Sequence, residues 1–155
     1  MPRTVLVFIV LAAAVVLAAG CGGSNSAPTL TEYEQSVVTA RDRVDFALGR
    51  ITKAKAKDEF LNRMDEASAA IDDAASGLEE AGVAEGFDDE TKKLTDALHQ
   101  LSVDLSATAS DLRQPEGQVL VTGASGLNFE SWDQANLALA SLIGQGIDVE
   151  LIGRH

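Results

Sequence analysis

The segment LTEYEQSVVTARDRVDFALGRITKA, residues 30–54, decides the fold because its apolar side chains recur in alternating steps of three and four. These positions are Leu30, Tyr33, Val37, Ala40, Val44, Ala47, Ile51 and Ala54. Side chains at this spacing lie on one face of an α-helix. Thr31 and Glu34 fit the S/T-x-x-E capping box, so the sequence predicts that a helix begins at Thr31.

A second apolar run follows with the same alternating steps, at Phe60, Met64, Ala67, Ile71, Ala74, Leu78 and Ala81. The step from Ala54 to Phe60 breaks the phase between the two runs. Asp58 is a suitable helix N-cap, which predicts a turn near residues 55–58 and two separate helices. No Gly or Pro marks this turn, so one bent helix over residues 31–81 is the alternative.

Two further helices are predicted from their end signals. Gly82 is expected to end the second helix, and Gly86 with the acids at 88–90 is expected to open the third, because a helix N-terminus carries partial positive charge. The apolar positions of the third helix are Leu94, Leu98, Leu101, Leu105 and Leu112, and Pro115 and Gly117 should stop it. Ser131 with Gln134 predicts the capping box of a shorter fourth helix. That helix carries Trp132, Ala135, Leu139 and Leu142 and should close at Gly144 or Gly146.

Four amphipathic segments joined by short connections favour antiparallel neighbours. We therefore predict an all-α fold, a small up-and-down bundle of three to four helices over residues 31–146. A short irregular or strand-like tail over residues 147–155 should follow it. Many of the apolar positions are alanine and bury little area each, so the predicted stability is modest.

The N-terminal region has the layout of a secretory signal peptide. Arg3 precedes the apolar run of residues 5–19, and small residues lead to Cys21. The run is shorter than the ~20 apolar residues that a membrane-spanning helix needs, so an uncleaved anchor is the weaker alternative. We predict a signal peptide over residues 1–20 and a flexible Gly- and Ser-rich tether over residues 21–30.

The junction Leu17-Ala18-Ala19-Gly20-Cys21 resembles the lipobox of bacterial lipoproteins, in which small residues precede an acylated cysteine. The resemblance implies that Cys21 becomes the mature N-terminus and carries fatty acyl chains such as palmitate. It also implies that the protein is held at the extracytoplasmic face of the cell membrane. Two or more acyl chains anchor a protein stably. In composition, the remaining chain resembles small Ala-rich helical lipoproteins of unknown function.

The charge of the chain excludes some partners. The net charge is −12, and removal of residues 1–20 would remove Arg3 and no acid. A body this acidic is repelled by phosphate backbones and anionic headgroups, so we expect neither nucleic-acid binding nor a polybasic membrane patch. The charge is also uneven, with six basic and two acidic residues over 41–57 and four basic and sixteen acidic over 58–116. We interpret this as solvated, complementary faces, with an acidic face for a basic partner or cations as the alternative.

One glycine-rich stretch, VLVTGASG at residues 119–126, resembles the opening of short-chain dehydrogenases. Phe129 stands where the dinucleotide fingerprint has its third glycine, and the chain after Gly126 is too short for the further strands of that fold. We interpret the stretch as a loop after the third helix. A local pairing of two strands, residues 119–122 with 147–152, is left open.

No pattern in the sequence indicates catalysis or a cofactor. Asp96-x-x-His99 faintly resembles the Glu-x-x-His of di-iron bundles, but such sites need a second copy and two more glutamates. Met64 is expected to fill the core rather than bind haem. Trp132 is expected to anchor the core, with contact to a partner as the alternative.

From these features we expect a non-enzymatic, lipid-anchored bundle that binds or assembles with another envelope component. The alternative is a carrier that holds a small apolar ligand, haem or a metal in the bundle core, because the alanines leave side-chain volume unfilled.

Overall fold

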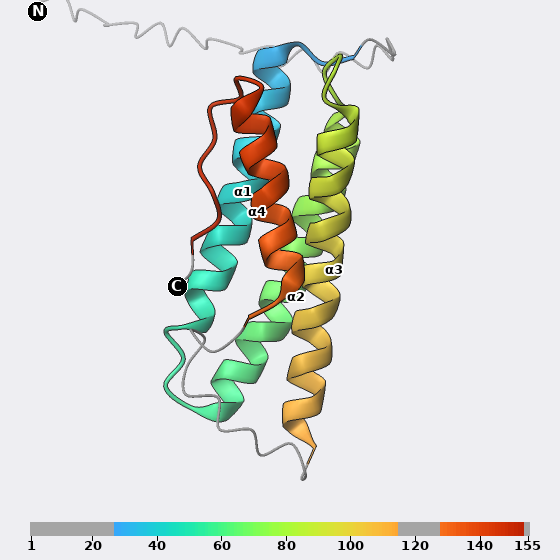
Figure 1. The fold of residues 1–155 in the computed structure, drawn as a ribbon. Coiled ribbons are helices and arrows are strands. Elements are labelled where there is room, and N and C mark those ends of the chain that lie inside the picture. Colours follow the sequence, from blue (N-terminus) through green and yellow to red (C-terminus); the bar gives the residue numbers. More distant parts are fainter. Residues whose placement is uncertain (1–26, 115–127, 154–155) are drawn as a thin grey trace, which may run out of the picture.

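The computed structural model describes residues 27–114 and 128–153, and it confirms the all-α bundle. Its helices are α1 (Leu30–Ile51), α2 (Lys57–Ala81), α3 (Asp88–Arg113) and α4 (Glu130–Gly144). Consecutive helices run up and down beside one another, and the described ranges contain no strand (Figure 1). The predicted up-and-down topology is therefore correct.

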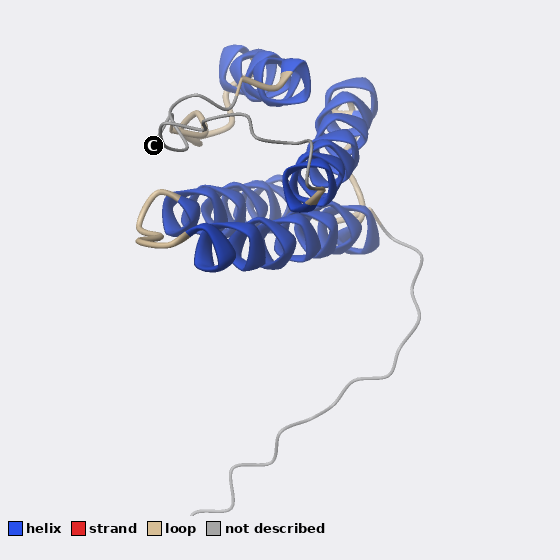
Figure 2. Ribbon diagram, turned by 90° about the horizontal axis from the view of Figure 1, so that it is seen from below, coloured by secondary structure: helices blue, strands red, loops and turns tan. Residues whose placement is uncertain are grey.

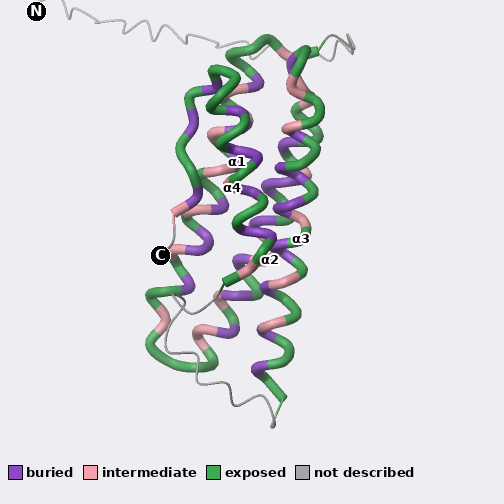
Figure 3. The backbone as a smooth tube through the Cα atoms, in the orientation of Figure 1, coloured by how far each residue is buried: buried purple, intermediate pink, exposed green. Residues whose placement is uncertain are grey.

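The core lies where the alternating apolar positions meet inside the bundle (Figure 3). Most of the predicted positions are buried, including Tyr33, Val37, Met64, Ile71 and Leu101, each with no exposed surface. Leu30 is a wrong assignment because it is 53% exposed. It is the first residue of α1 and has no helix beyond it to pack against. Among the other end positions, Phe60 is half-buried and Ala81 is exposed.

The connection between the first two helices excludes a single bent helix. Helix α1 ends at Ile51, and α2 begins at Lys57. The predicted Asp58 N-cap is wrong, because the N-cap is Ala56 and no side chain caps it. Instead, the Glu59 carboxylate accepts the backbone N–H of Lys55 at 2.8 Å and pairs with Arg63. The carboxylate thus orders the turn without a glycine or proline.

The capping box of α1 lies two residues earlier than predicted. Thr29 Oγ1 accepts the Glu32 N–H at 3.3 Å, and the Glu32 carboxylate accepts the Thr29 N–H at 2.9 Å. The sequence contains overlapping T-x-x-E patterns, and the earlier one adds a further helical bond from the Tyr33 N–H to the Thr29 carbonyl. Glu34, which we had assigned to the box, accepts the backbone N–H of Asp148.

The predicted capping box of α4 is also wrong. Helix α4 begins at Glu130, with Phe129 as an N-cap that makes no side-chain bond. Ser131 donates its hydroxyl to the Asp104 carboxylate of α3, and Gln134 donates to Glu130 at 3.2 Å. The serine is drawn to a neighbouring helix, a contact that local sequence does not specify.

The other end signals are confirmed where the structure describes them. Gly82 follows α2 with a φ of 79°, and the three acids begin α3. After α4, Gly146 takes the positive φ of 100° that reverses the chain. Pro115, Gly117 and the glycine-rich stretch at 119–126 lie outside the described residues.

The C-terminal tail, residues 145–153, completes the bundle. The three main helix–helix interfaces join α1 to α2, α2 to α3 and α3 to α4, so α1 and α4 form no interface of that kind. The tail runs back from the end of α4 along α1 (Figure 1), and Figure 2 shows it on the side of α4 away from α3. Ile147, Val149 and Ile152 are buried, although residues 147–152 form no strand. The tail therefore takes the place of a helix–helix contact.

Candidate functional site

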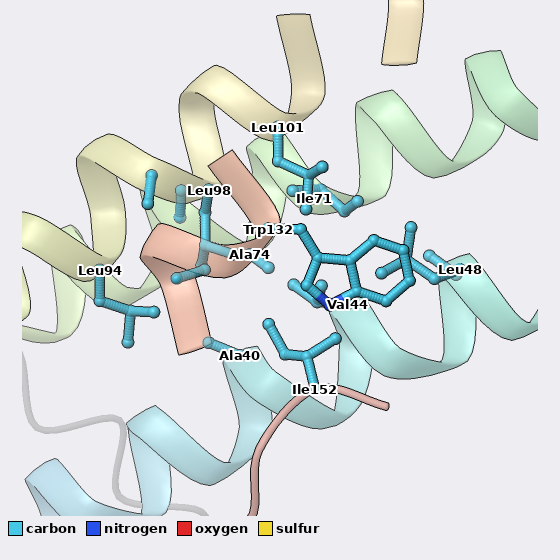
Figure 4. Close-up of a cluster of buried hydrophobic side chains, with 14 of the residues drawn as sticks. Ala40, Val44, Leu48, Ile71, Ala74, Leu94, Leu98, Leu101, Trp132 and Ile152 are labelled. Atoms are coloured by element: carbon cyan, nitrogen blue, oxygen red, sulfur yellow. The ribbon is translucent and has the colours of Figure 1, made fainter. Parts of the chain in front are cut away.

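Trp132 lies inside the bundle near the start of α4. It is 8% exposed, as expected for a core anchor. Figure 4 shows the indole ring among Val44 and Leu48 of α1 and Ile152 of the tail. The ring spans the space between α4 and α1, whose backbones approach less closely than those of the other neighbouring helices.

The indole nitrogen of Trp132 has no hydrogen-bond partner. Across the described ranges it is the one buried side-chain polar atom left in this state. The other buried polar side chains are Thr91, Thr95, Ser102 and Ser131, and none of these residues carries a charge. Each buried polar group without a partner costs free energy, so this N–H marks an unusual point in the core.

A hydrogen bond between α1 and α3 was not foreseen. The Tyr33 hydroxyl bonds the Thr91 hydroxyl, which itself donates to the Phe87 carbonyl at 2.7 Å. Burial raises the pKa of Tyr33, and the nearby carboxylates of Glu90 and Asp88 raise it further. A buried tyrosine needs a partner for its hydroxyl, but spacing along the chain cannot identify a partner on another helix.

The residues considered for metal or haem do not form a site with one another. His99 is half-buried on α3, with Nδ1 at 2.8 Å from Asp72 and Nε2 at 3.5 Å from Glu79, both on α2. Met64 has no exposed surface and packs in the core. Within the described residues, no three His, Cys, Asp or Glu side chains are grouped to hold a metal ion. His99 thus joins two helices at the surface.

A basic surface runs from the second half of α1 through the turn into α2. We call it the basic end and define it as Arg43, Phe46, Arg50, Lys53, Lys55 and Lys57, all of them exposed. Phe46 is 68% exposed and lies with Arg43 and Arg50 on one groove of about 100 Å³ between α1 and α2. Arg50 pairs with Glu66 at 2.9 Å, whereas Arg43, Lys53 and Lys57 pair with no other described residue.

Arg41 belongs to the basic run of the sequence but not to the basic end. Its guanidinium donates to the Leu151 carbonyl at 2.7 Å and pairs with Asp42 and Glu150. Its side chain is only 15% exposed. Arg41 holds the tail, so it is unavailable to a partner.

The opposite end of the bundle is acidic. The end of α2, the loop after it and the start of α3 place exposed carboxylates there, at Glu79, Glu80, Glu85, Asp88 and Asp89. The chain enters α1 at this same end (Figure 1). The basic run and the acids that the sequence separates along the chain thus gather toward opposite ends of the bundle.

Helix α4 presents a second unusual surface. No charged residue occurs from Gln134 to Gly144, and Leu137 and Ile143 are 70% and 41% exposed. Leu137 lines a groove of about 620 Å³ between α3 and α4, together with Lys93, Asp96 and Gln100. The groove mixes apolar and charged side chains.

Comparisons with known proteins give no match from which a function could be proposed. No family model matches the chain, and no curated protein or solved structure gives a significant match. Of the helices described, none is long and apolar enough to cross a membrane. Residues 1–26, which include Cys21, lie outside the described residues, as does His155.

Proposed function

We propose that the protein is a lipid-anchored, non-enzymatic envelope protein whose helical bundle binds another envelope component. The lipobox-like junction supports the anchor, because Cys21 stands where acylation needs a cysteine and is the only one in the chain. The acidic bundle adds no attraction to anionic headgroups, so the acyl chains would hold the protein alone.

The basic end is the docking surface of this proposal. The observation that carries it is the exposed ring of Phe46, which shares a groove with Arg43 and Arg50 on a chain whose net charge is −12. An exposed aromatic side chain flanked by arginines is the composition that interface hot spots favour. The complementary partner is an acidic protein surface, which the positive field of the basic end would steer into contact.

The position of the basic end fits an anchored protein. The tether joins α1 at Leu30, and α1 has 22 residues before the turn that carries the lysines. A helix of this length spans about 33 Å, since each residue rises about 1.5 Å. A protein held by Cys21 would therefore present the basic end away from the membrane and keep its acidic end close to it.

The experiment places a photoreactive phenylalanine analogue at position 46 of the full chain in its native cells. We expect a cross-linked acidic protein whose yield falls several-fold in the double variant Lys53→Gln, Lys57→Gln. The matched control is Lys92→Gln, Lys93→Gln, which removes the same charge at the other end and should leave the yield unchanged. Equal yields in the two double variants, or no cross-link at position 46, would contradict the proposal.

A carrier is the second candidate function, and one observation favours it. The N–H of Trp132 is buried without a partner in the space between α1 and α4, which the tail helps to fill. This is where a ligand would gain a hydrogen bond without displacing one that the protein already makes.

A further inference from the structure

The space between α1 and α4 differs from the rest of the core in how it is closed. Helix α1 approaches α2, α2 approaches α3 and α3 approaches α4 closely, whereas Trp132 and the tail fill much of the space from α4 to α1. Figure 4 shows Val44, Leu48, Trp132 and Ile152 gathered there, with Ile71 and Leu101 above them in the view. All of these side chains are apolar except for the indole N–H.

Small side chains are buried on both helices. Ala40 of α1 appears in the same view as Ile152 (Figure 4), and Ala135 of α4 has no exposed surface. Alanine contributes little volume, so the large indole and the tail supply most of the apolar volume here.

Side chains of α1 and α4 attach the tail by hydrogen bonds. Asn136 bonds both backbone groups of Ile152, Arg41 bonds Leu151 and Glu150, Glu34 accepts the Asp148 N–H, and Asp45 accepts the Gly153 N–H at 2.8 Å. Water can replace each of these partners when the tail lifts, and the apolar loss is limited to three side chains, Ile147, Val149 and Ile152. Segments held in this way open at lower free energy than the whole fold does.

We propose that this space binds one aliphatic chain that carries a neutral carbonyl, such as a fatty acyl ester. The chain would lie between α1 and α4 where the tail side chains now pack, and its carbonyl would accept the N–H of Trp132. This proposal is independent of the basic end, which lies on the outer face of α1 and α2.

The chemistry of the core selects an ester over a carboxylate. One N–H offers a single hydrogen bond, which does not compensate for moving a full charge out of water. The buried polar residues in the described ranges are threonines and serines, and the largely buried guanidinium of Arg41 already pairs with Asp42 and Glu150, so it is not free to pair with an anionic ligand. A neutral carbonyl needs no such cation.

The ester has two sources, a free fatty ester or the acyl chain of a membrane glycerolipid, and one experiment distinguishes them. Trp132 is the only tryptophan, so its fluorescence reports this space alone. The full chain is reconstituted in dioleoylphosphatidylcholine vesicles and titrated with methyl dibromostearate, whose bromines quench indole on contact. In the second arm, the phosphatidylcholine itself carries dibromostearoyl chains and no free ester is added.

We expect saturable quenching by the free ester that unbrominated methyl stearate relieves. Quenching in the second arm as well would identify the bilayer lipid as a source, and its absence there would identify the free ester. Quenching in neither arm would overturn the proposal. Quenching that rises without saturation and that methyl stearate does not relieve would also overturn it, because it would report contact with the bilayer surface.

Two variants separate this role from a structural one. Trp132→Phe keeps an aromatic ring but lacks the N–H, so the retained ester, quantified by mass, should reflect affinity weakened about fivefold. The N–H makes no hydrogen bond in the free protein. Its removal should therefore cost the unliganded protein no hydrogen bond when unfolding by urea is measured. Asn136→Ala loosens the tail and should speed quenching about tenfold, since it removes both hydrogen bonds from α4 to Ile152. The control Asn62→Ala, an exposed position on α2, should leave the rate unchanged. Unchanged retention in Trp132→Phe would contradict the role of the N–H.

Discussion

The side-chain amide of Asn136 on α4 bonds both backbone groups of Ile152 in the tail. Its Nδ2 donates to the Ile152 carbonyl at 3.1 Å, and its Oδ1 accepts the Ile152 N–H at 2.8 Å. The amide thus does for Ile152 what a neighbouring strand would do in a sheet. This is how an irregular tail buries Ile152 without leaving its backbone groups unpaired.

Asn136→Ala should lower the free energy of unfolding by about 2 kcal/mol, because two part-buried backbone groups lose their partner. The measurement is the urea midpoint, with Asn62→Ala, an exposed asparagine on α2, as the control. Equal midpoints for the two variants would show that the tail contributes nothing to stability.

Thr29→Ala should destabilise the protein by about 1 kcal/mol, since Thr29 is the N-cap of α1. Thr31→Ala is the control, because Thr31 lies within the first turn and is exposed. Thermal unfolding of both variants checks the prediction. A larger loss in Thr31→Ala would place the helix start where the sequence alone suggested it.

The same capping box should weaken in acid. The hydrogen bond from the Thr29 backbone, and then the one from its side chain, lower the pKa of Glu32. A depressed pKa contributes stability above the unfolded value of about 4.3 and loses it as the pH falls through the folded pKa. The difference in free energy of unfolding between the wild-type protein and Glu32→Gln should therefore decrease as the pH is lowered from 7 to about 3. A constant gap would contradict the box.

Gly82→Ala and Gly77→Ala should change the free energy of unfolding in opposite directions. Gly82 has a φ of 79°, and an added Cβ would lie 3.3 Å from Pro28, so we expect a loss of about 1 kcal/mol. Gly77 lies inside α2 with nothing within 4 Å of the added atom, so alanine should stabilise the helix by about 0.5–1 kcal/mol. Urea unfolding measures both, and a shared sign would contradict the left-handed backbone at Gly82.

Tyr33 should make the fold sensitive to alkali. Burial raises the pKa of Tyr33 above the ordinary value of 10.0. Its contribution to the free energy of unfolding is therefore complete below the pKa of the unfolded chain and is lost as the pH rises through the pKa of the folded protein. Tyr33 is the only tyrosine, so the ultraviolet absorbance of its phenolate follows this titration directly. Unfolding free energies of the wild type and Tyr33→Phe should converge above about pH 10. An ordinary titration midpoint in the folded protein would contradict the burial of this hydroxyl.

The sequence predicted the parts of the fold that repeat along one helix. Positions such as Val37, Ile71 and Leu101 recur at the helical period, and a packed core requires only that such faces meet. The end of α2 at Gly82 could also be predicted, because a left-handed backbone conformation favours glycine. Helix starts were harder to predict, because Thr29 and Thr31 offer overlapping capping boxes that local chemistry ranks alike.

The candidate sites could not be predicted because they depend on contacts between distant residues. Arg41 and Arg43 look equivalent in the sequence, yet Arg41 holds the tail and Arg43 faces solvent. Asn136 and Ile152 have no local pattern that marks them as partners. The unpaired N–H of Trp132 likewise follows from three-dimensional packing.

The central claim is that Cys21 anchors this bundle to a membrane through acyl chains, and Cys21→Ser tests it most directly. The variant and the wild type are expressed in the native cells, and each is followed through membrane fractionation with its N-terminus determined. We expect the wild type in the membrane fraction with a blocked, acylated Cys21, and the variant largely outside it. A variant that stays in the membrane at the wild-type level with an uncut N-terminus would show that residues 5–19 are the anchor and would contradict the account.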